Sequence, residues 1–443
     1  MDCLAYLDQG LKVAVIGGGW AGLAAAVELA SAGIRVTVFE AAKQLGGRAR
    51  SVDIDGHPLD NGQHILLGAY RETLRLMNAV GADPERRLKR LPLTLTFPAS
   101  RPPFRFRLPP LPAPLHLAIG LLSARGVRLT EKREAVRFMR SLQTANYQLD
   151  ADCSVAALLD RHAQHDRLRQ HLWEPLCLAA LNTAPDKASA QIFANVLRDS
   201  LGGERTDTDL LLPTAGLDHL FPRAAADFIR ARGGQICLST RVGHIDNTLG
   251  ISGEAFDRII LATAPQHAAT ILAQRKETAG IAAMLARYAY EPIGTAYAGY
   301  PPTLTLPFPM LGLGDGTGKN IGQWVFDRGA LGGEKGLMGF VLSADGDWDQ
   351  RSNESLITTL HDELESALQA RLPPPLWHQV IRERRATFSC RPDLPRPLAK
   401  TPCPGLWLAG DYVCAGYPAT LEGAVRSGVN AARELLASAG ETG

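Results

Sequence analysis

A glycine-rich segment near the start of the chain has residues spaced as in a dinucleotide-binding site. In GGGWAG, Gly17, Gly19 and Gly22 form the pattern G-x-G-x-x-G between an apolar run, 12–17, and an Ala- and Leu-rich stretch, 22–33. Gly17 permits the tight turn, Gly19 lets the backbone approach a pyrophosphate, and Gly22 lets a helix pack closely on a strand. The chemistry predicted for this segment is the binding of two phosphate groups.

The elements that must position these glycines form one βαβ unit. The first strand leads into a helix that begins at Trp20 and Ala21, whose N–H groups would face the phosphate charges. RVTVFE (35–40) is a second apolar strand and ends in Glu40, whose carboxylate can accept hydrogen bonds from both ribose hydroxyls. Such a unit has a right-handed crossover and a parallel sheet. The sequence therefore predicts dinucleotide binding; the alternative is a Gly-rich turn of an unrelated α/β domain.

Two further segments point to FAD as the dinucleotide. QLGGRARS contains Gly46, Gly47 and Arg48, and LWLAGDYVCAGYPATLEGAVRSG contains Gly410, Asp411 and the sequence LEGA. Both segments resemble the extended signature of the amine oxidase and phytoene desaturase flavoproteins. The resemblance implies an FAD cofactor, with Gly46 and Gly47 letting the chain pass close to the flavin.

The same resemblance implies a role for several other residues. Arg48 would lie over the cofactor near its phosphates, although a surface ion pair is the alternative. Asp411 would bind the ribityl or pyrophosphate region, and Val242 would contact the adenine through its backbone. The N–H groups of Leu421 and Glu422 would face the flavin O2, where a helix N-terminus stabilises negative charge on the reduced flavin.

Four stretches narrow the resemblance to one branch of this superfamily. The squalene-associated desaturase branch, specifically the hydroxysqualene dehydroxylases, is resembled by DNGQHILLGAY (60–70), WEPLCLAALNT (173–183), LLPTAGL (211–217) and AGDYVCAGYPATLEGAVRSG (409–428). The resemblance implies a long apolar isoprenoid substrate and an electron donor that the sequence does not identify. The implied reaction removes the allylic hydroxyl of hydroxysqualene, and hydride from reduced FAD replaces it to give squalene.

Single residues bear on the choice between this function and its alternatives. Amine oxidases usually carry an aromatic residue two positions before the Glu of the final E-G-A, whereas this chain has Thr420 there and Tyr417 out of register. A carotenoid desaturase, which runs the flavin in the opposite direction, stays an alternative, as does a non-catalytic prenyl-lipid-binding escort protein. His64 falls in the stretch that this superfamily runs alongside the isoalloxazine ring. It is the candidate catalytic residue, and a structural histidine is the alternative.

Basic residues gather in one part of the chain. Residues 86–140 contain 13 Lys or Arg against two acids, whereas the whole chain has a net charge of only +2. Within this window, FPASRPPFRFRLPPLPAPLHLAIGLL sets arginines among Phe, Leu and Pro, a mixture suited to an anionic lipid surface. The segment is a candidate membrane-surface segment. The alternative is a solvated basic face beside an apolar substrate wall.

A chain of 443 residues is longer than a single hydrophobic core usually supports, so more than one domain is expected. Strand-like runs also recur far along the chain. The runs at 233–245, 256–265 and 405–412 look like further strands of the first sheet, followed by a helix over 420–436. The predicted fold class is α/β, a Rossmann-like FAD-binding domain of the amine oxidase and phytoene desaturase type with an inserted α+β substrate domain. The FAD-binding domain would comprise 1–80, 205–265 and 386–443, and the substrate domain 81–204 and 266–385.

Composition places the chain in a reducing compartment. Seven Cys without a C-x-x-C pair indicate neither a disulfide framework nor a zinc site. MDCLAYLDQG lacks the features of a signal peptide, and no run of about 18 apolar residues occurs. No H-E-x-x-H, P-loop or G-x-S-x-G pattern is present, so no metal and no nucleic-acid partner is predicted. We expect a cytoplasmic protein that contacts the inner face of the cell membrane peripherally.

Overall fold

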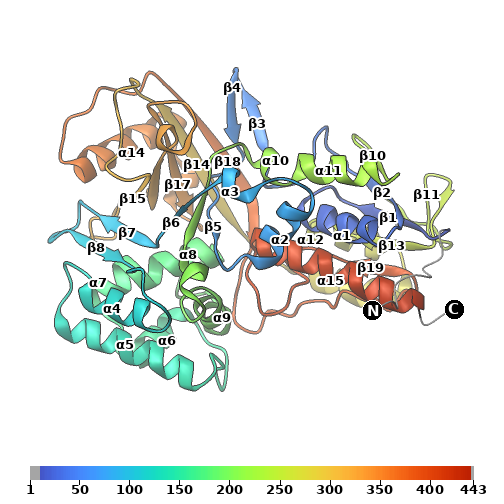
Figure 1. Cartoon of the computed structure of the whole chain (residues 1–443), viewed down its shortest axis with the longest axis horizontal. Coiled ribbons are helices and arrows are strands. Elements are labelled where there is room, and N and C mark those ends of the chain that lie inside the picture. Colours follow the sequence, from blue (N-terminus) through green and yellow to red (C-terminus); the bar gives the residue numbers. More distant parts are fainter. Residues whose placement is uncertain (1–9, 441–443) are drawn as a thin grey trace.

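The computed structural model describes residues 10–440. The expectations that rest on residues 1–9 and 441–443, including the absence of a signal peptide, lie outside the described residues. Figure 1 shows two halves side by side, one built on a parallel sheet near both ends of the described chain and one that carries a second sheet and a group of helices. The predicted α/β fold class is confirmed.

The parallel sheet has the strand order β10-β2-β1-β13-β19, and every neighbouring pair in it is parallel. Its strands are β1 (Lys12–Ile16), β2 (Arg35–Phe39), β10 (Gln235–Cys237), β13 (Arg258–Leu261) and β19 (Leu406–Leu408). The run predicted at 233–245 is wrong in length, because the strand ends at Cys237. Ser239 there adopts a φ of 52°, and its N–H donates to Ala42 O instead of extending the ladder.

Helix α1 (Trp20–Ser31) joins β1 to β2 and packs against both α11 (Pro222–Ala231) and α15 (Leu421–Gly440). Helix α15 crosses α1 at Gly428, where a Cβ atom would collide with the carbonyl oxygen of Ala21. The two backbones therefore touch without an intervening side chain. The smaller helices of this half are α2 (Arg71–Ala79), α3 (Pro84–Arg87), α10 (Leu217–Leu220), α12 (Pro265–Leu272) and α13 (Ala279–Leu285).

The second half contains an antiparallel sheet of order β15-β16-β17-β14-β18. Its strands are β14 (Tyr290–Gly299), β15 (Met310–Gly312), β16 (Trp324–Asp327), β17 (Leu337–Ser343) and β18 (Trp377–Phe388). Helix α14 (Asn353–Leu368) covers one face, where its Leu356 and Leu360 pack with Ala296 and Phe340 of the sheet. The other face of β14 is left for the cavity described below.

Helices fill the rest of this half, as expected from the helical pattern of the middle segment. They are α4 (Leu115–Ser123), α5 (Leu129–Thr144), α6 (Val155–Arg161), α7 (Asp166–Leu168), a π-helical turn (Arg169–Trp173), α8 (Glu174–Leu181) and α9 (Ala190–Ser200). Beside them, the hairpin of β7 (Thr94–Phe97) and β8 (Phe104–Arg107) buries Phe97, Phe104 and Phe106 in the core. The aromatic residues of the basic segment are therefore interior.

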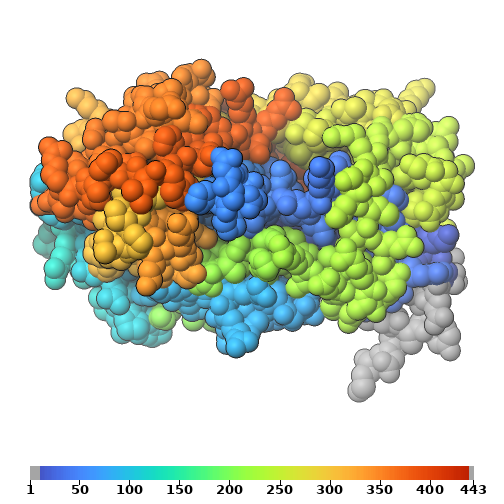
Figure 2. All heavy atoms as spheres, turned by 90° about the horizontal axis from the view of Figure 1, so that it is seen from above, coloured from blue at the N-terminus to red at the C-terminus, as the bar shows by residue number. Residues whose placement is uncertain are grey.

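Two small sheets lie between the two halves. They are β3 (Ser51–Ile54) with β4 (His57–Asp60), and β5 (Leu66–Leu67) with β9 (Leu210–Pro213) and β6 (Leu88–Leu91). The hairpin of β11 (Gly250–Ile251) and β12 (Glu254–Ala255) lies at the outer end of the parallel-sheet half (Figure 1). Figure 2 shows the blue residues of the β3–β4 hairpin between the orange and the green parts of the surface. Asp60 accepts from the Leu217 N–H on one side, and its backbone carbonyl accepts from the Tyr297 hydroxyl on the other. The predicted domain limits stay predictions.

None of the helices within residues 10–440 combines the length and the apolar character that a bilayer-spanning segment needs.

The α1–α15 crossing gives a first prediction, on stability. Gly428→Ala should lower the midpoint of thermal unfolding, because the added methyl group has no space against Ala21 and overpacking typically costs about 1–3 kcal/mol. Gly280→Ala in α13 is the matched control, because a Cβ there meets nothing within 4 Å. It should leave the midpoint unchanged or raise it, since Ala is the better helix former by roughly 0.5–1 kcal/mol. Equal midpoints for the two variants would contradict the close crossing.

Candidate functional site

A cavity of about 900 Å³ opens at the carboxyl ends of the parallel strands. The residues that follow four of these strands line it, among them Gly17 after β1, Glu40 after β2, Thr263 after β13 and Asp411 after β19. This edge is where open α/β sheets bind their ligands. The volume lies within the roughly 300–1,000 Å³ typical of small-molecule sites.

The predicted site residues gather around this one cavity. Those that line it are Gly17, Gly19, Trp20, Ala21, Glu40, Gly46, Gly47, Arg48, His64, Val242, Gly410, Asp411 and Leu421. Gly22 and Glu422 do not line it. Their contacts are described below, and the individual cofactor contacts predicted for all these residues stay predictions.

The three motif glycines have different neighbours. A Cβ on Gly17, whose φ is 113°, would lie 2.5 Å from Ala262 O, and a Cβ on Gly22 would collide with Gly17 O. The nearest atom to a Cβ on Gly19 would be the Cα of Gly47 at 3.8 Å. Gly17 and Gly22 are thus required by the protein's own packing. Gly19 is not, so its missing side chain leaves space open to a ligand.

Glu40 and Trp20 shape the loop between β1 and α1. The Glu40 carboxylate accepts from the N–H of Gly18 and from the N–H of Ala42, both at 2.7 Å. The Trp20 indole Nε1–H donates to Ala49 O at 3.1 Å and so ties α1 to the segment that contains Arg48. Each carboxylate oxygen of Glu40 keeps a lone pair, which leaves it able to accept from ribose hydroxyls.

Arg48 and Asp411, predicted separately from two distant motifs, form an ion pair of 2.7 Å. Arg48 also donates to Ala386 O on β18 at 2.6 Å. Burial alone would lower the pKa of the Arg48 guanidinium, but the adjacent Asp411 carboxylate raises it above its usual value. The pair joins two cofactor motifs to the second sheet, and both members face the cavity.

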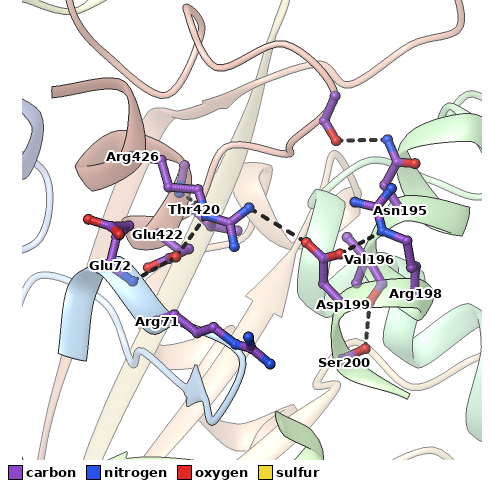
Figure 3. Close-up of polar contacts among 12 residues, drawn as sticks. Arg71, Glu72, Asn195, Val196, Arg198, Asp199, Ser200, Thr420, Glu422 and Arg426 are labelled. Atoms are coloured by element: carbon purple, nitrogen blue, oxygen red, sulfur yellow. Dashed lines mark hydrogen bonds and ion pairs between the residues drawn. The ribbon is translucent and has the colours of Figure 1, made fainter. Parts of the chain in front are cut away.

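The N-terminus of α15 is held by its own second residue. The fully buried Glu422 carboxylate accepts from the N–H groups of Glu72 and Thr73 at the start of α2, from the Thr73 hydroxyl at 2.7 Å, and from Arg426 Nε at 2.8 Å. Figure 3 shows Glu422 between Glu72 and Arg426. A negative charge between two helix N-termini is favourable. The side chain of Glu422 therefore positions α15 from outside the cavity.

Helix α9 holds the same region from the other side. Arg426 forms an ion pair with Asp199 at 3.6 Å, and the Asn195 amide donates to Gly416 O at 2.9 Å (Figure 3). Within residues 10–440, the backbone N–H groups of Leu421 and Glu422 make no hydrogen bond. A fixed helix N-terminus with free donors beside a cavity suits an anionic or electron-rich ligand atom.

The cavity continues from the parallel sheet to the second sheet, where its wall is mixed. The apolar residues of this part include Ile65, Ile293 and Ile381, and the polar ones include Asn182 and Thr387. No residue of 86–140 lines the cavity, so the basic segment is not part of its wall.

His64 and Thr295 place polar atoms in this part of the cavity. The His64 Nδ1 lies 2.9 Å from Gly62 O, and because a carbonyl only accepts, Nδ1 carries the proton. Burial lowers the pKa of His64, so the ring is neutral near pH 7 and Nε2 is an acceptor. The hydroxyl of the buried Thr295 has no partner among the described residues. Gly62 lies close to both, since a Cβ there would be 3.6 Å from His64 Cε1 and 3.8 Å from Thr295 Oγ1.

Sequence reasoning missed Thr295 and Thr263. Both line the cavity, and the hydroxyls of both lack a partner among the described residues. No local motif marks either residue, because only the meeting of distant strands brings them to the site. The unpaired Thr263 hydroxyl, the free helix N–H groups and the space beside Gly19 together fit a bound dinucleotide.

The comparisons with known proteins agree with this geometry. The family model described as flavin containing amine oxidoreductase matches residues 20–436. A hydroxysqualene dehydroxylase of Rhodopseudomonas palustris is 31% identical over 97% of this chain and 99% of its own length. A 15-cis-phytoene desaturase of Narcissus pseudonarcissus is 25% identical over 97% of this chain and 80% of its own. A solved oxidoreductase from Methanosarcina mazei, 17% identical, has a TM-score of 0.71 and covers 96% of this chain and 100% of that one.

The glycine contacts give a second prediction, on cofactor content. Gly19→Val should fold like the parent but purify without yellow flavin, because its side chain would occupy only the space left for the ligand. Gly22→Val should instead lower the yield of folded protein, because its side chain collides with Gly17. Absorbance near the flavin bands and circular dichroism measure the two effects separately. Full flavin occupancy in folded Gly19→Val would refute the position assigned to the pyrophosphate.

Proposed function

Because this chain belongs to the flavin-containing amine oxidoreductase family, we propose that it is an FAD-dependent oxidoreductase that removes the allylic hydroxyl of hydroxysqualene to give squalene. The observation that carries the proposal is the end-to-end similarity to a hydroxysqualene dehydroxylase, at 31% identity over 97% of the chain. The phytoene desaturase is less similar, at 25%, and is covered over only 80% of its length. We further propose a cytoplasmic location at the inner membrane face and an external electron donor.

The residues that would hold FAD follow from the site. The loop at Gly17 and Gly19 with the first turn of α1 would take the pyrophosphate, and Glu40 the ribose. The free N–H groups at the start of α15 would face the flavin ring, where they favour the anionic reduced form. When reduced, FAD supplies the hydride that replaces the hydroxyl.

The chain's own residues would orient the alcohol and keep water out. The neutral His64 accepts the hydrogen bond of the substrate hydroxyl at Nε2, and Thr295 Oγ1 binds the same oxygen. The hydroxyl would leave as water after taking up one proton from solvent, so each squalene formed would consume one hydride and one proton. Ile293 and Ile381 line the surrounding wall, which matters because bulk water would recapture the allylic cation. In its neutral form His64 has no proton to give at Nε2, so its role is to position the hydroxyl.

The direction of hydride transfer provides the third prediction. Anaerobically reduced enzyme mixed with hydroxysqualene should regain the oxidised flavin spectrum and form one squalene per flavin in a single turnover. The oxidised enzyme, used as the control, should not react with this substrate. If phytoene bleaches the oxidised flavin while hydroxysqualene leaves the reduced spectrum unchanged, the desaturase function replaces the proposal. A colourless protein would favour the lipid-binding escort.

The His64 and Thr295 side chains provide the fourth prediction. Thr295→Val should slow the single-turnover reoxidation of reduced enzyme by hydroxysqualene about ten-fold, because one hydrogen bond to the substrate is lost. Thr295→Ser keeps the hydroxyl and is the matched control. His64→Phe should slow the step by a similar factor, and flavin content should be unchanged in all three variants. If Thr295→Val and His64→Phe are both reoxidised at the rate of the parent, these residues do not bind the substrate hydroxyl.

The pKa of His64 sets the expected pH dependence of the same step. Since burial lowers this pKa below the usual value of about 6.5, the ring stays neutral as the pH falls from 8 to 6.5. The rate should therefore be constant over this range and decrease only at lower pH, where the ring becomes protonated. A loss centred above pH 6.5 that disappears in His64→Phe would contradict the neutral role.

A further inference from the structure

Helix α4 exposes one apolar face to solvent. Leu115, Ile119 and Leu122, spaced four and three residues apart, are 52%, 41% and 47% exposed. The opposite side of α4 is buried, at His116, Leu117, Gly120 and Leu121. Leu129, at the start of α5, is 56% exposed. Four of the seven large hydrophobic residues that are exposed in the described chain therefore lie between 115 and 129.

The chain that leads into α4 extends this apolar surface. Pro110, Pro112, Ala113 and Pro114 are exposed directly before Leu115. Contiguous exposed apolar surface on a folded protein marks a contact site. We define the outer face of α4 as Leu115, Ile119 and Leu122 together with Leu129.

A stripe of arginines continues from this face along α5. Arg133, Arg137 and Arg140 follow Leu129 at helical spacing, so they lie on the same side of α5. All three are exposed, and none forms an ion pair with a residue in the described range. By contrast, Arg223 in α11 forms an ion pair with Asp218. Positive charge on α5 is thus left uncompensated by the protein itself.

The two surfaces are adjacent. Helices α4 and α5 pack together, and Lys132 on α5 donates to the carbonyl of Leu122 at the end of the α4 face at 2.9 Å. Exposed Arg107 and Arg125, which also lack ion pairs among the described residues, lie on the strand and the turn that flank α4. Figure 1 shows α4 and α5 at the end of the molecule farthest from the parallel sheet.

We propose that the outer face of α4 and the arginine stripe of α5 dock the protein on an anionic lipid bilayer. The apolar side chains would enter the interface between headgroups and acyl chains, and the arginines would bind the headgroup phosphates. Phe104 and Phe106 are buried in the core and cannot contact a bilayer. The proposed contact therefore lies on α4 and α5 and not in the middle of the basic segment. A hydrocarbon substrate would come from the same lipid phase, and only in this respect does the proposal rest on the proposed function.

Flotation of the yellow holoenzyme with vesicles of 70% phosphatidylcholine and 30% phosphatidylglycerol tests the apolar face. L115Q/I119Q/L122Q should bind these vesicles about ten-fold more weakly than the parent. L376Q/L398Q is the matched control, because these leucines are 71% and 78% exposed on other parts of the surface. It should bind like the parent.

A second pair of variants tests the charges. R133Q/R137Q/R140Q should lose about ten-fold or more in binding to the anionic vesicles, with a smaller salt dependence than the parent. R223Q/R230Q/R232Q, in and next to α11, removes the same number of charges from the other half and should bind like the parent. Pure phosphatidylcholine vesicles should bind the parent weakly.

The proposal would be overturned if the α4 and α5 variants both bound the vesicles as tightly as the parent. It would also be overturned if both controls lost as much vesicle binding as these variants. A parent that is dimeric in solution and becomes monomeric in L115Q/I119Q/L122Q would overturn it as well, because a second copy would then cover the face. Single-turnover reoxidation with detergent-dispersed hydroxysqualene should be the same for all variants. If the parent itself fails in that assay while vesicle binding behaves as expected, the proposed reaction is wrong and the docking surface stands.

Discussion

The position of helix α1 is the constraint on which the site depends. Two close backbone contacts hold its first turn. A side chain at Gly22 would collide with the loop after β1, and a side chain at Gly428 of α15 would collide with α1 where the two helices cross. Both helices consequently begin at the same cavity, α1 at the dinucleotide loop and α15 at Leu421. Two helix N-termini that converge on one space each contribute positive potential there.

Buried charge maintains this arrangement. Glu422 has no exposure to solvent, yet its carboxylate receives donors from α2 and from Arg426, so the charge is compensated by hydrogen bonds. Removal of one partner from such a group is costly, because the other stays buried and unpaired. The first turns of α15 are thus fixed jointly by α2 and α9, two helices that belong to opposite halves of the molecule.

The sequence predicted the parts of the site that depend on local pattern. The spacing of Gly17, Gly19 and Gly22 after an apolar strand implies the loop, because turn, strand and helix within about 30 residues specify each other. Thr295 carries no such pattern, since only pairing between distant strands turns its hydroxyl to the cavity. The role of the Glu422 side chain and the burial of Phe104 are likewise decided by tertiary packing, which single-sequence spacing does not encode.

The ion pair of Arg48 and Asp411 connects the cofactor motifs to the chamber wall. Arg48 also donates to Ala386 on β18, the strand that supplies Ile381 to the cavity wall. The guanidinium of Arg48 thus contacts the Asp411 carboxylate at the cofactor end and the backbone of β18 at the other. Loss of this one side chain would remove both contacts at once, so the two ends of the cavity share a single support.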